Sequence, residues 1–223
     1  MSGIYEESKN SMLEIIPAIL AHTTQELEEG LSRLRGVASL VQIDLVGKNI
    51  LAGEESIPFW DEFDFEADIM LAHPSQELQA ILNAGPSRVV IHATAADAKK
   101  ALDMLQETRQ GEFKIEVGVA LASHDTPEAL EPFDGLYDYV QVMGIDHIGV
   151  QGEPADPHHK EIELITKLRE KFPELAIQVD GATGAHPREL KEAGANRLIV
   201  GSRVMNASDP KAELKAIYTE ATS

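Results

Sequence analysis

Residues 38–48 read A-S-L-V-Q-I-D-L-V-G-K, and this stretch decides the fold. Its apolar run, residues 40–46, is short, rich in branched side chains and closed by Gly47, which is typical of a buried parallel strand. Gln42 and Asp44 interrupt the run two residues apart, so their side chains lie on the same face of the strand. A carboxylate on a buried strand is costly unless it is paired, protonated or bound to a metal. Asp44 is therefore either part of a polar network or a functional group.

The same apolar pattern repeats along the chain and alternates with longer amphipathic stretches. The expected strands are residues 14–20, 40–46, 65–71, 88–93, 114–121, 139–143, 175–180 and 197–201. Between them, polar caps followed by proline or by a leucine stripe predict helices. Eight strand-then-helix units in 223 residues predict a (β/α)8 barrel of the TIM type, and a doubly wound sheet is the alternative. We expect one domain over residues 1–223, with residues 1–12 as a polar extension.

Composition limits the classes of partner. The chain has 19 Lys and Arg against 38 Asp and Glu, a net charge of −19, which disfavours nucleic acid and anionic membrane surfaces. It has no cysteine, so thiolate metal sites and disulfides are excluded. No apolar run approaches the ~20 residues of a membrane span, and the start of the chain is unlike a signal peptide, so we expect a cytoplasmic protein.

Polar side chains fall near the C-terminal ends of several expected strands, where barrel enzymes build their active sites. They are Asp44, Asp68, His92 and Asp180, and the apolar Met143 falls at the same end. Glycines follow the seventh and eighth strands, and the loop of residues 144–152 contains three more, so backbone N–H groups there could hold a phosphate. Each residue also has a structural interpretation: a buried acid bonded to backbone, a core histidine, or a methionine that fills space. Convergence of several strands on one end favours a site.

The motifs V-Q-I-D-L, E-A-D-I-M-L-A-H-P, V-Q-V-M-G-I-D-H-I-G-V-Q-G-E-P, Q-V-D-G-A and V-G-S-R-V resemble those of the ribulose-phosphate 3-epimerases, which are ribulose-phosphate-binding barrels. The resemblance covers residues 16 to about 214. It implies that Asp44 and Asp180 form the acid/base pair. It also implies an isomerase that epimerises D-ribulose 5-phosphate and D-xylulose 5-phosphate, and a homodimer or larger homo-oligomer in which the segment around Phe59 and Trp60 lies at an interface. The substrate-binding and phosphate-binding positions implied by the site pattern and the resemblance are His92, Met70, Met143, Gly149, Gln151, Gly152, Gly181, Ala182, Gly201 and Ser202.

This chain departs from the family pattern at the metal. The family holds a divalent ion with two histidines and the two aspartates, and Gln42 and Asp68 stand at the histidine positions here. Ala18 stands at the position of a family serine. Gln42, Asp44, Asp68 and Asp180 could form an all-oxygen site, which favours Mg²⁺ or Mn²⁺ over Zn²⁺. Alternatively, no metal binds and a cation such as Lys48 balances the acids. No organic cofactor is expected.

Three functions remain open from the sequence. The first is epimerisation of a ketose phosphate by two-base proton transfer through an enediolate. The second is another sugar-phosphate lyase or epimerase on the same scaffold, although related synthases and decarboxylases use Asp-X-Lys-X-X-Asp, and Asp68-Ile69-Met70 lacks the lysine. The third is a non-catalytic sugar-phosphate-binding barrel, which the loss of both histidines favours.

Overall fold

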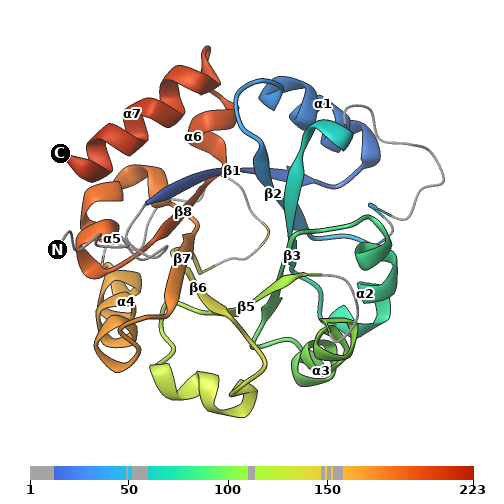
Figure 1. Cartoon of the computed structure of the whole chain (residues 1–223). Helices are drawn as coiled ribbons and strands as arrows, with labels where there is room; N and C mark the ends of the chain where they lie inside the picture. The colour runs from blue at the N-terminus through green and yellow to red at the C-terminus, as the bar shows by residue number, and fades with distance from the viewer. Residues whose placement is uncertain are drawn as a thin grey trace, which may run out of the picture.

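The chain forms a closed parallel barrel. A computed structural model describes residues 13–48, 50–51, 60–109, 114–146, 149, 152 and 158–223, so the expected extension at residues 1–12 lies outside the described part. The strands follow one another around the ring in sequence order, from β1 to β8, and β8 closes back onto β1. Figure 1 looks down this ring, with the helices outside it. The (β/α)8 prediction is confirmed, and the doubly wound alternative is wrong.

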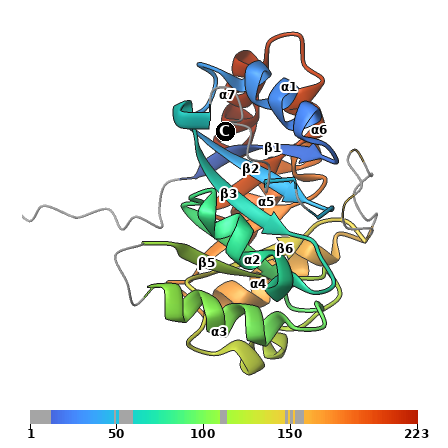
Figure 2. The same cartoon turned by 90° about the vertical axis from the view of Figure 1, so that its right-hand side faces the viewer.

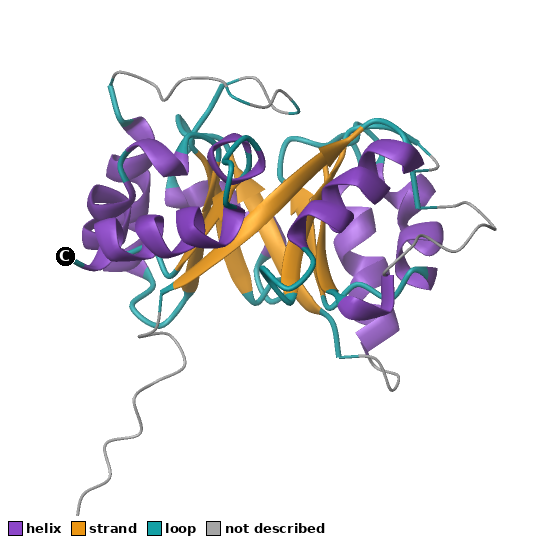
Figure 3. Ribbon diagram, turned by 90° about the horizontal axis from the view of Figure 1, so that it is seen from above, coloured by secondary structure: helices purple, strands orange, loops and turns teal. Residues whose placement is uncertain are grey.

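The strands match the expected runs to within two residues at each end. They are β1 (Glu14–Ala21), β2 (Leu40–Leu45), β3 (Asp64–Ile69), β4 (Arg88–His92), β5 (Glu116–Leu121), β6 (Tyr139–Met143), β7 (Ala176–Asp180) and β8 (Arg197–Val200). All neighbouring pairs are parallel. Figures 2 and 3 show the strands tilted across the barrel, with helices on either side of them.

Helices cover the outside of the ring. The α-helices are α1 (Thr24–Leu34), α2 (Pro74–Asn83), α3 (Ala98–Arg109), α4 (Lys160–Lys171), α5 (Pro187–Ala193), α6 (Ser202–Met205) and α7 (Pro210–Thr222). The 3₁₀ helices are η1 (Trp60–Glu62), η2 (Pro127–Phe133) and η3 (Thr183–Ala185). The helix that follows β5, η2, is thus a 3₁₀ helix. Pro132 within η2 has no N–H for an α-helical hydrogen bond, which favours the tighter form.

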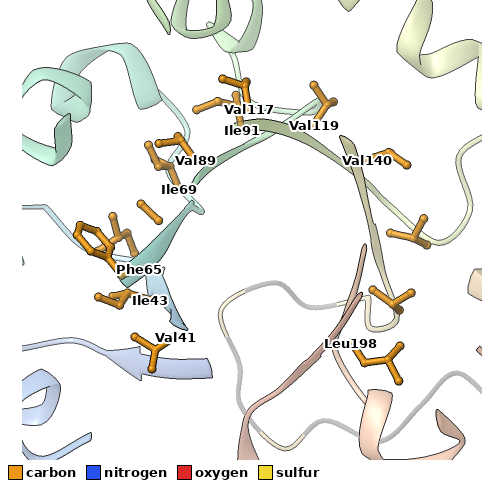
Figure 4. Close-up of a cluster of buried hydrophobic side chains, with 14 of the residues drawn as sticks. Val41, Ile43, Phe65, Ile69, Val89, Ile91, Val117, Val119, Val140 and Leu198 are labelled. Carbon is orange, nitrogen blue, oxygen red and sulfur yellow. The ribbon is translucent and has the colours of Figure 1, made fainter. Parts of the chain in front are cut away.

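Alternate residues of each strand face outward and make the main hydrophobic core. Val41 and Ile43 of β2 are fully buried on that side, whereas Gln42 and Asp44 face inward. Figure 4 shows this outer set, with labelled side chains of β2 to β6 and of β8 pointing away from the barrel axis. The helices close over it: Leu27, Leu31 and Leu34, the predicted stripe of α1, are 0% exposed. The inside of the barrel holds the polar side chains together with two small apolar clusters, one of which includes Val90 and Tyr139 and the other Ile16 and Ile199.

The N-terminal end of the barrel is closed by an ionic floor, which we define as Glu14, Arg88, Glu116 and Arg197. Arg88 contacts Glu14 at 3.1 Å and Glu116 at 3.0 Å, and Arg197 contacts Glu116 at 2.7 Å. The guanidinium carbon of Arg197 also lies 4.8 Å from the ring centroid of Tyr139, directly inside the floor. These ion pairs connect β1, β4, β5 and β8 at the N-terminal end of the barrel. The opposite, C-terminal end is therefore the place for a site.

Tyr139 fits inside the barrel because β5 carries a glycine opposite it. A Cβ on Gly118 would lie 2.5 Å from Cζ of the fully buried Tyr139 ring. We expect Gly118→Ala to lower the free energy of unfolding by about 1–3 kcal/mol through overpacking, measured by urea denaturation. Gly47→Ala is the matched control, because its Cβ would meet nothing closer than Ile50 at 3.6 Å. Equal stability of the two variants would contradict this packing.

In the part of the chain that the structure describes, no helix combines the length and apolar character needed to span a bilayer.

Candidate functional site

Three aspartates converge at the C-terminal end of the barrel. Asp44, Asp68 and Asp180 end or nearly end β2, β3 and β7, and one carboxylate oxygen of each lies within 4.8 Å of the others. Asp44 is 9% exposed, Asp180 8% and Asp68 0%. The inward face of each strand places them there, as the alternation in residues 40–46 predicts. These acids form the acid cluster.

Gln42 connects two members of the acid cluster. Its amide nitrogen donates to Oδ1 of Asp44 at 2.8 Å and to Oδ2 of Asp180 at 3.1 Å. Its carbonyl oxygen accepts from Gln178 at 3.2 Å. In this arrangement Gln42 holds the two carboxylates as a donor, and its predicted role as a metal ligand stays a prediction.

Asp68, the third member of the acid cluster, has a partner for each of its carboxylate oxygens. Oδ1 of Asp68 lies 2.9 Å from Nε2 of His92, and Oδ2 accepts from the amide of Gln141 at 2.7 Å. His92 is 5% exposed. The contact of His92 with substrate stays a prediction, and the structure gives the imidazole a carboxylate partner. Asp68 and His92 together form a buried acid–imidazole pair at the edge of the acid cluster.

A polar layer lies between the acid cluster and the ionic floor. The amide of Gln178 donates to the carbonyl of Gln141 at 2.7 Å and also to Glu66. The hydroxyl of Tyr139 donates to Oε2 of Glu66 at 3.0 Å. Gln178, Gln141 and Glu66 are each 0% exposed. This layer fixes the amides that orient the acids above it.

Burial raises the pKa values of Asp44 and Asp180, which we call the acid pair. For Asp180 the causes are burial first and then the charges of Asp44 and Asp68, and its pKa lies well above the usual range. For Asp44 the causes are burial and the charge of Asp68, which raise the pKa to about 7. Burial acts to lower the pKa of His92, but the charge and hydrogen bond of Asp68 outweigh it, so the pKa of His92 is raised. The raised pKa values of Asp44 and Asp180 favour the protonated form of at least one of the two acids near neutral pH.

A cavity of about 210 Å³ opens above the pair. Asp44 and Asp180 line it, but Asp68 and His92 do not. Its other walls include these predicted substrate-binding or phosphate-binding residues: Met70, Met143, Gly149, Gly152, Gly181, Ala182, Gly201 and Ser202. The structure thus brings the acid pair and the glycine-rich turns to one space. Gln151, also predicted there, and Phe59 of the expected interface lie outside the described residues.

The turn after β7 is shaped by close packing. Gly181 has φ +93° and a Cβ there would meet Ile145 at 2.7 Å, while Ala182 follows at φ +54°. A Cβ on Gly144 would overlap the carbonyl oxygen of Gly181. Only glycine at residues 144 and 181 permits this approach, which draws the turns after β6 and β7 together at the cavity wall.

Two basic side chains near the cavity are already engaged. Arg203 contacts Glu213 at 2.6 Å, Glu220 at 2.7 Å and the carbonyl of Gly184 at 2.6 Å. Lys48 is largely exposed and lies 3.9 Å from Glu77. The acid partner of Lys48 in this arrangement lies on α2, so the hypothesis that Lys48 balances the acid cluster stays a prediction.

The polar layer was not predicted from the sequence. Its members alternate with predicted ones on the same strands: Glu66 precedes Asp68, Gln141 precedes Met143, and Gln178 precedes Asp180, each by two residues. The period of two that paired Gln42 with Asp44 would have identified all of them.

Glu66 gives the protein a measurable pH dependence. Burial raises its pKa to about 7, so its stabilising contribution is complete below about pH 4.5 and is lost as the pH rises through 7. Between pH 5 and 8 we expect the free energy of unfolding of the wild type to fall by about 3 kcal/mol more than that of Glu66→Gln. Urea denaturation at each pH measures this. Glu163→Gln on the exposed face of α4 is the control and should follow the wild type. Parallel curves for wild type and Glu66→Gln would contradict the shift.

Comparison with known sequences finds relatives that act on phosphorylated compounds according to their names. The sequence model described as the ribulose-phosphate 3 epimerase family matches residues 14–205. The ribulose-phosphate 3-epimerase of Bacillus subtilis is 27% identical over 221 residues, covering 92% of this chain and 98% of its own. The orotidine 5'-phosphate decarboxylase of Pyrococcus horikoshii is 31% identical over 147 residues, covering 63% of each chain.

Solved structures share the fold. A 3-hexulose-6-phosphate synthase has a TM-score of 0.67 at 18% identity, covering 93% of this chain and 99% of its own. The orotidine 5'-monophosphate decarboxylase of Sulfolobus solfataricus has a TM-score of 0.63 at 17% identity, covering 94% of this chain and 98% of its own. At these identities the likeness shows the barrel alone.

Proposed function

Since the chain belongs to the ribulose-phosphate 3-epimerase family, we propose that it epimerises a ketose phosphate at the carbon next to the carbonyl, with D-ribulose 5-phosphate and D-xylulose 5-phosphate as the pair. The observation that carries the proposal is the position of Asp44 and Asp180 on one cavity wall, where the amide nitrogen of Gln42 bridges their carboxylates. Epimerisation needs one group that takes a proton and a second that returns one to the other face. A carboxylate and a carboxylic acid at a common site satisfy that need.

The two acids come from different parts of the ring. β2 carries Asp44 and β7 carries Asp180, with β1 and β8 between them. In the proposed reaction the ionised acid abstracts the proton from C3 of the sugar, and the protonated acid delivers its own proton to the opposite face. Gln42 holds both carboxylates in position through one amide nitrogen.

The phosphate is proposed to bind at the turns after β7 and β8. Gly181, Ala182, Gly201 and Ser202 line the cavity there and offer backbone N–H groups. Arg203 lines the cavity, but its guanidinium charge is already paired with Glu213 and Glu220. It is therefore not proposed as the main partner of the phosphate. An anion-binding site made of backbone also fits a protein whose surface is strongly acidic.

The donor set of the acid cluster fits a hard divalent cation. Three carboxylates lie within ligand reach of one another, and burial together with their mutual repulsion raises the pKa values of Asp44 and Asp180. Asp44, Asp68 and Asp180 would hold Mg²⁺ or Mn²⁺, since oxygen ligands suit these ions. When bound, the ion would supply positive charge beside the oxygens of the enediolate. His92 keeps Asp68 in place from the side away from the cavity.

Decarboxylase or synthase chemistry has less support. Relatives with those names share the scaffold, but Met70 stands where their Asp-X-Lys-X-X-Asp pattern requires lysine, and it lines the cavity. The described residues of the cavity wall include no lysine, so they offer no ammonium group to a carbanion next to Asp68.

The proposed function is tested by incubating the protein with D-ribulose 5-phosphate in deuterium oxide and following C3 by proton NMR. We expect the C3 proton signal to disappear and D-xylulose 5-phosphate to form. Binding of the sugar phosphate without exchange would contradict the proposal and support the non-catalytic barrel. Exchange with a hexulose phosphate alone would change the substrate but keep the reaction.

A further inference from the structure

A second cluster of metal-ligand residues lies outside the barrel, at the start of α4 and α5. His159 is the residue before α4, Glu161 is in its first turn, and His186 is the residue before α5. One ligand atom of each lies within 4.8 Å of the others. α4 and α5 are neighbours in Figure 1. α4 follows β6 and α5 follows β7, so both come after the C-terminal strand ends that carry the acid cluster. We refer to these three residues as the peripheral cluster.

The contacts converge on one oxygen. Oε1 of Glu161 lies 2.9 Å from Nε2 of His186 and 3.5 Å from Nδ1 of His159. The two imidazole centroids are 4.8 Å apart and almost perpendicular, at 75°. Tetrahedral Zn²⁺ places neighbouring ligand atoms about 3.4 Å apart, given ligand bonds of about 2.1 Å. The Glu161–His159 distance of 3.5 Å is close to this value, and the Glu161–His186 distance of 2.9 Å is somewhat shorter.

One carboxylate oxygen of Glu161 lacks a hydrogen-bond partner among the described residues. Its side chain is 1% exposed, and the second oxygen, Oε2, is buried without a hydrogen-bond partner among the described residues. A buried carboxylate normally has both oxygens satisfied or coordinates a metal. A simple ion pair with His186 would leave Oε2 as it is, whereas a cation within the cluster could engage it. His186 is 10% exposed and His159 49%, so solvent reaches the cluster from one side.

We propose that His159, Glu161 and His186 bind Zn²⁺. Two imidazoles and one carboxylate are a donor set that proteins use for zinc with a fourth position left open. The same set is unsuited to Mg²⁺, which prefers oxygen ligands alone. The ion joins the start of α4 to the start of α5, so it stabilises the folded chain and does not take part in the reaction at the acid cluster. The two clusters therefore differ in metal preference.

The test uses the full chain, stripped with chelator and then saturated with Mg²⁺ to fill the acid cluster. Titration with Co²⁺ should give one equivalent of the intense visible absorption of a four-coordinate ion, and Zn²⁺ should displace it. His159→Ala/His186→Ala should lower the affinity for both ions at least about 100-fold, since even loss of residues that support ligands costs 10–100-fold. Glu161→Gln should lower it at least about 10-fold.

Two matched controls are available. His124→Ala removes another exposed-loop imidazole, and Glu163→Gln removes an exposed carboxylate of the same helix, and both should bind Co²⁺ like the wild type. Zn²⁺ should also raise the thermal midpoint of the wild type but not of His159→Ala, whose half-exposed side chain can be removed without unfolding the chain. If the double variant binds Co²⁺ as tightly as the wild type, or the wild type gives no four-coordinate spectrum, the proposal is wrong.

Discussion

Asp180→Asn is expected to lower kcat for the epimerisation by about 10²–10⁴-fold, because loss of a positioned proton-transfer group costs about that much. Asp44→Asn should cause a loss of the same order. The amide keeps the shape of the side chain and its contact with Gln42, so binding of the sugar phosphate should change little. Coupled assay of D-xylulose 5-phosphate formation measures kcat, and ligand titration measures binding.

The matched control for these variants is Asp103→Asn on the exposed face of α3, where the carboxylate pairs with Lys99. It should retain wild-type kcat. If Asp44→Asn and Asp180→Asn both turned over as fast as this control, the acid pair would not be the proton-transfer groups, whatever the barrel binds.

Removal of divalent cations is expected to reduce activity by about 100-fold or more, since an ion beside the reacting oxygens contributes several kcal/mol to the transition state. Addition of Mn²⁺ or Mg²⁺ should restore activity. Asp68→Asn should raise the concentration of Mn²⁺ that restores activity by at least about 10-fold, because it removes one charged ligand. The measurement is initial rate against free metal concentration after exhaustive chelation.

His186→Ala serves as the control for metal at the peripheral cluster, and its dependence on Mn²⁺ should match that of the wild type. Activity that survives chelation in both proteins would rule out the ion. That outcome would leave the two-base reaction intact, so the metal and the reaction are tested separately.

The barrel was predictable because local patterns decide it. Short apolar runs closed by turn residues, and capping residues such as Thr23 and Asp209 before helices, act over a few positions. The acid pair was predictable for a related reason. An acid within a buried strand is conspicuous, and the barrel fold places every C-terminal strand end at the same rim.

The rest depends on contacts between distant parts of the chain. His159 and His186 are separated by α4 and β7, so no sequence spacing indicated that both imidazoles meet Glu161. The partner of Lys48 was equally out of reach, since Glu77 lies on the next helix. The donor role of Gln42 depends on which amide atom faces the acids, and Gln178 decides that from another strand.

The ionic floor closes the end of the barrel opposite the cavity that Asp44 and Asp180 line. Glu66, Gln178 and Tyr139 are fully buried between it and the acid pair, so the described residues leave no route for water through the base of the barrel. Solvent therefore reaches the acid pair through the cavity at the other end of the barrel. In the proposed reaction the sugar phosphate would enter by the same opening, and a proton taken from carbon would stay at the acid pair until the product leaves. Deuterium from the solvent should consequently replace the protons of Asp44 and Asp180 only after one product has left and before the next substrate binds.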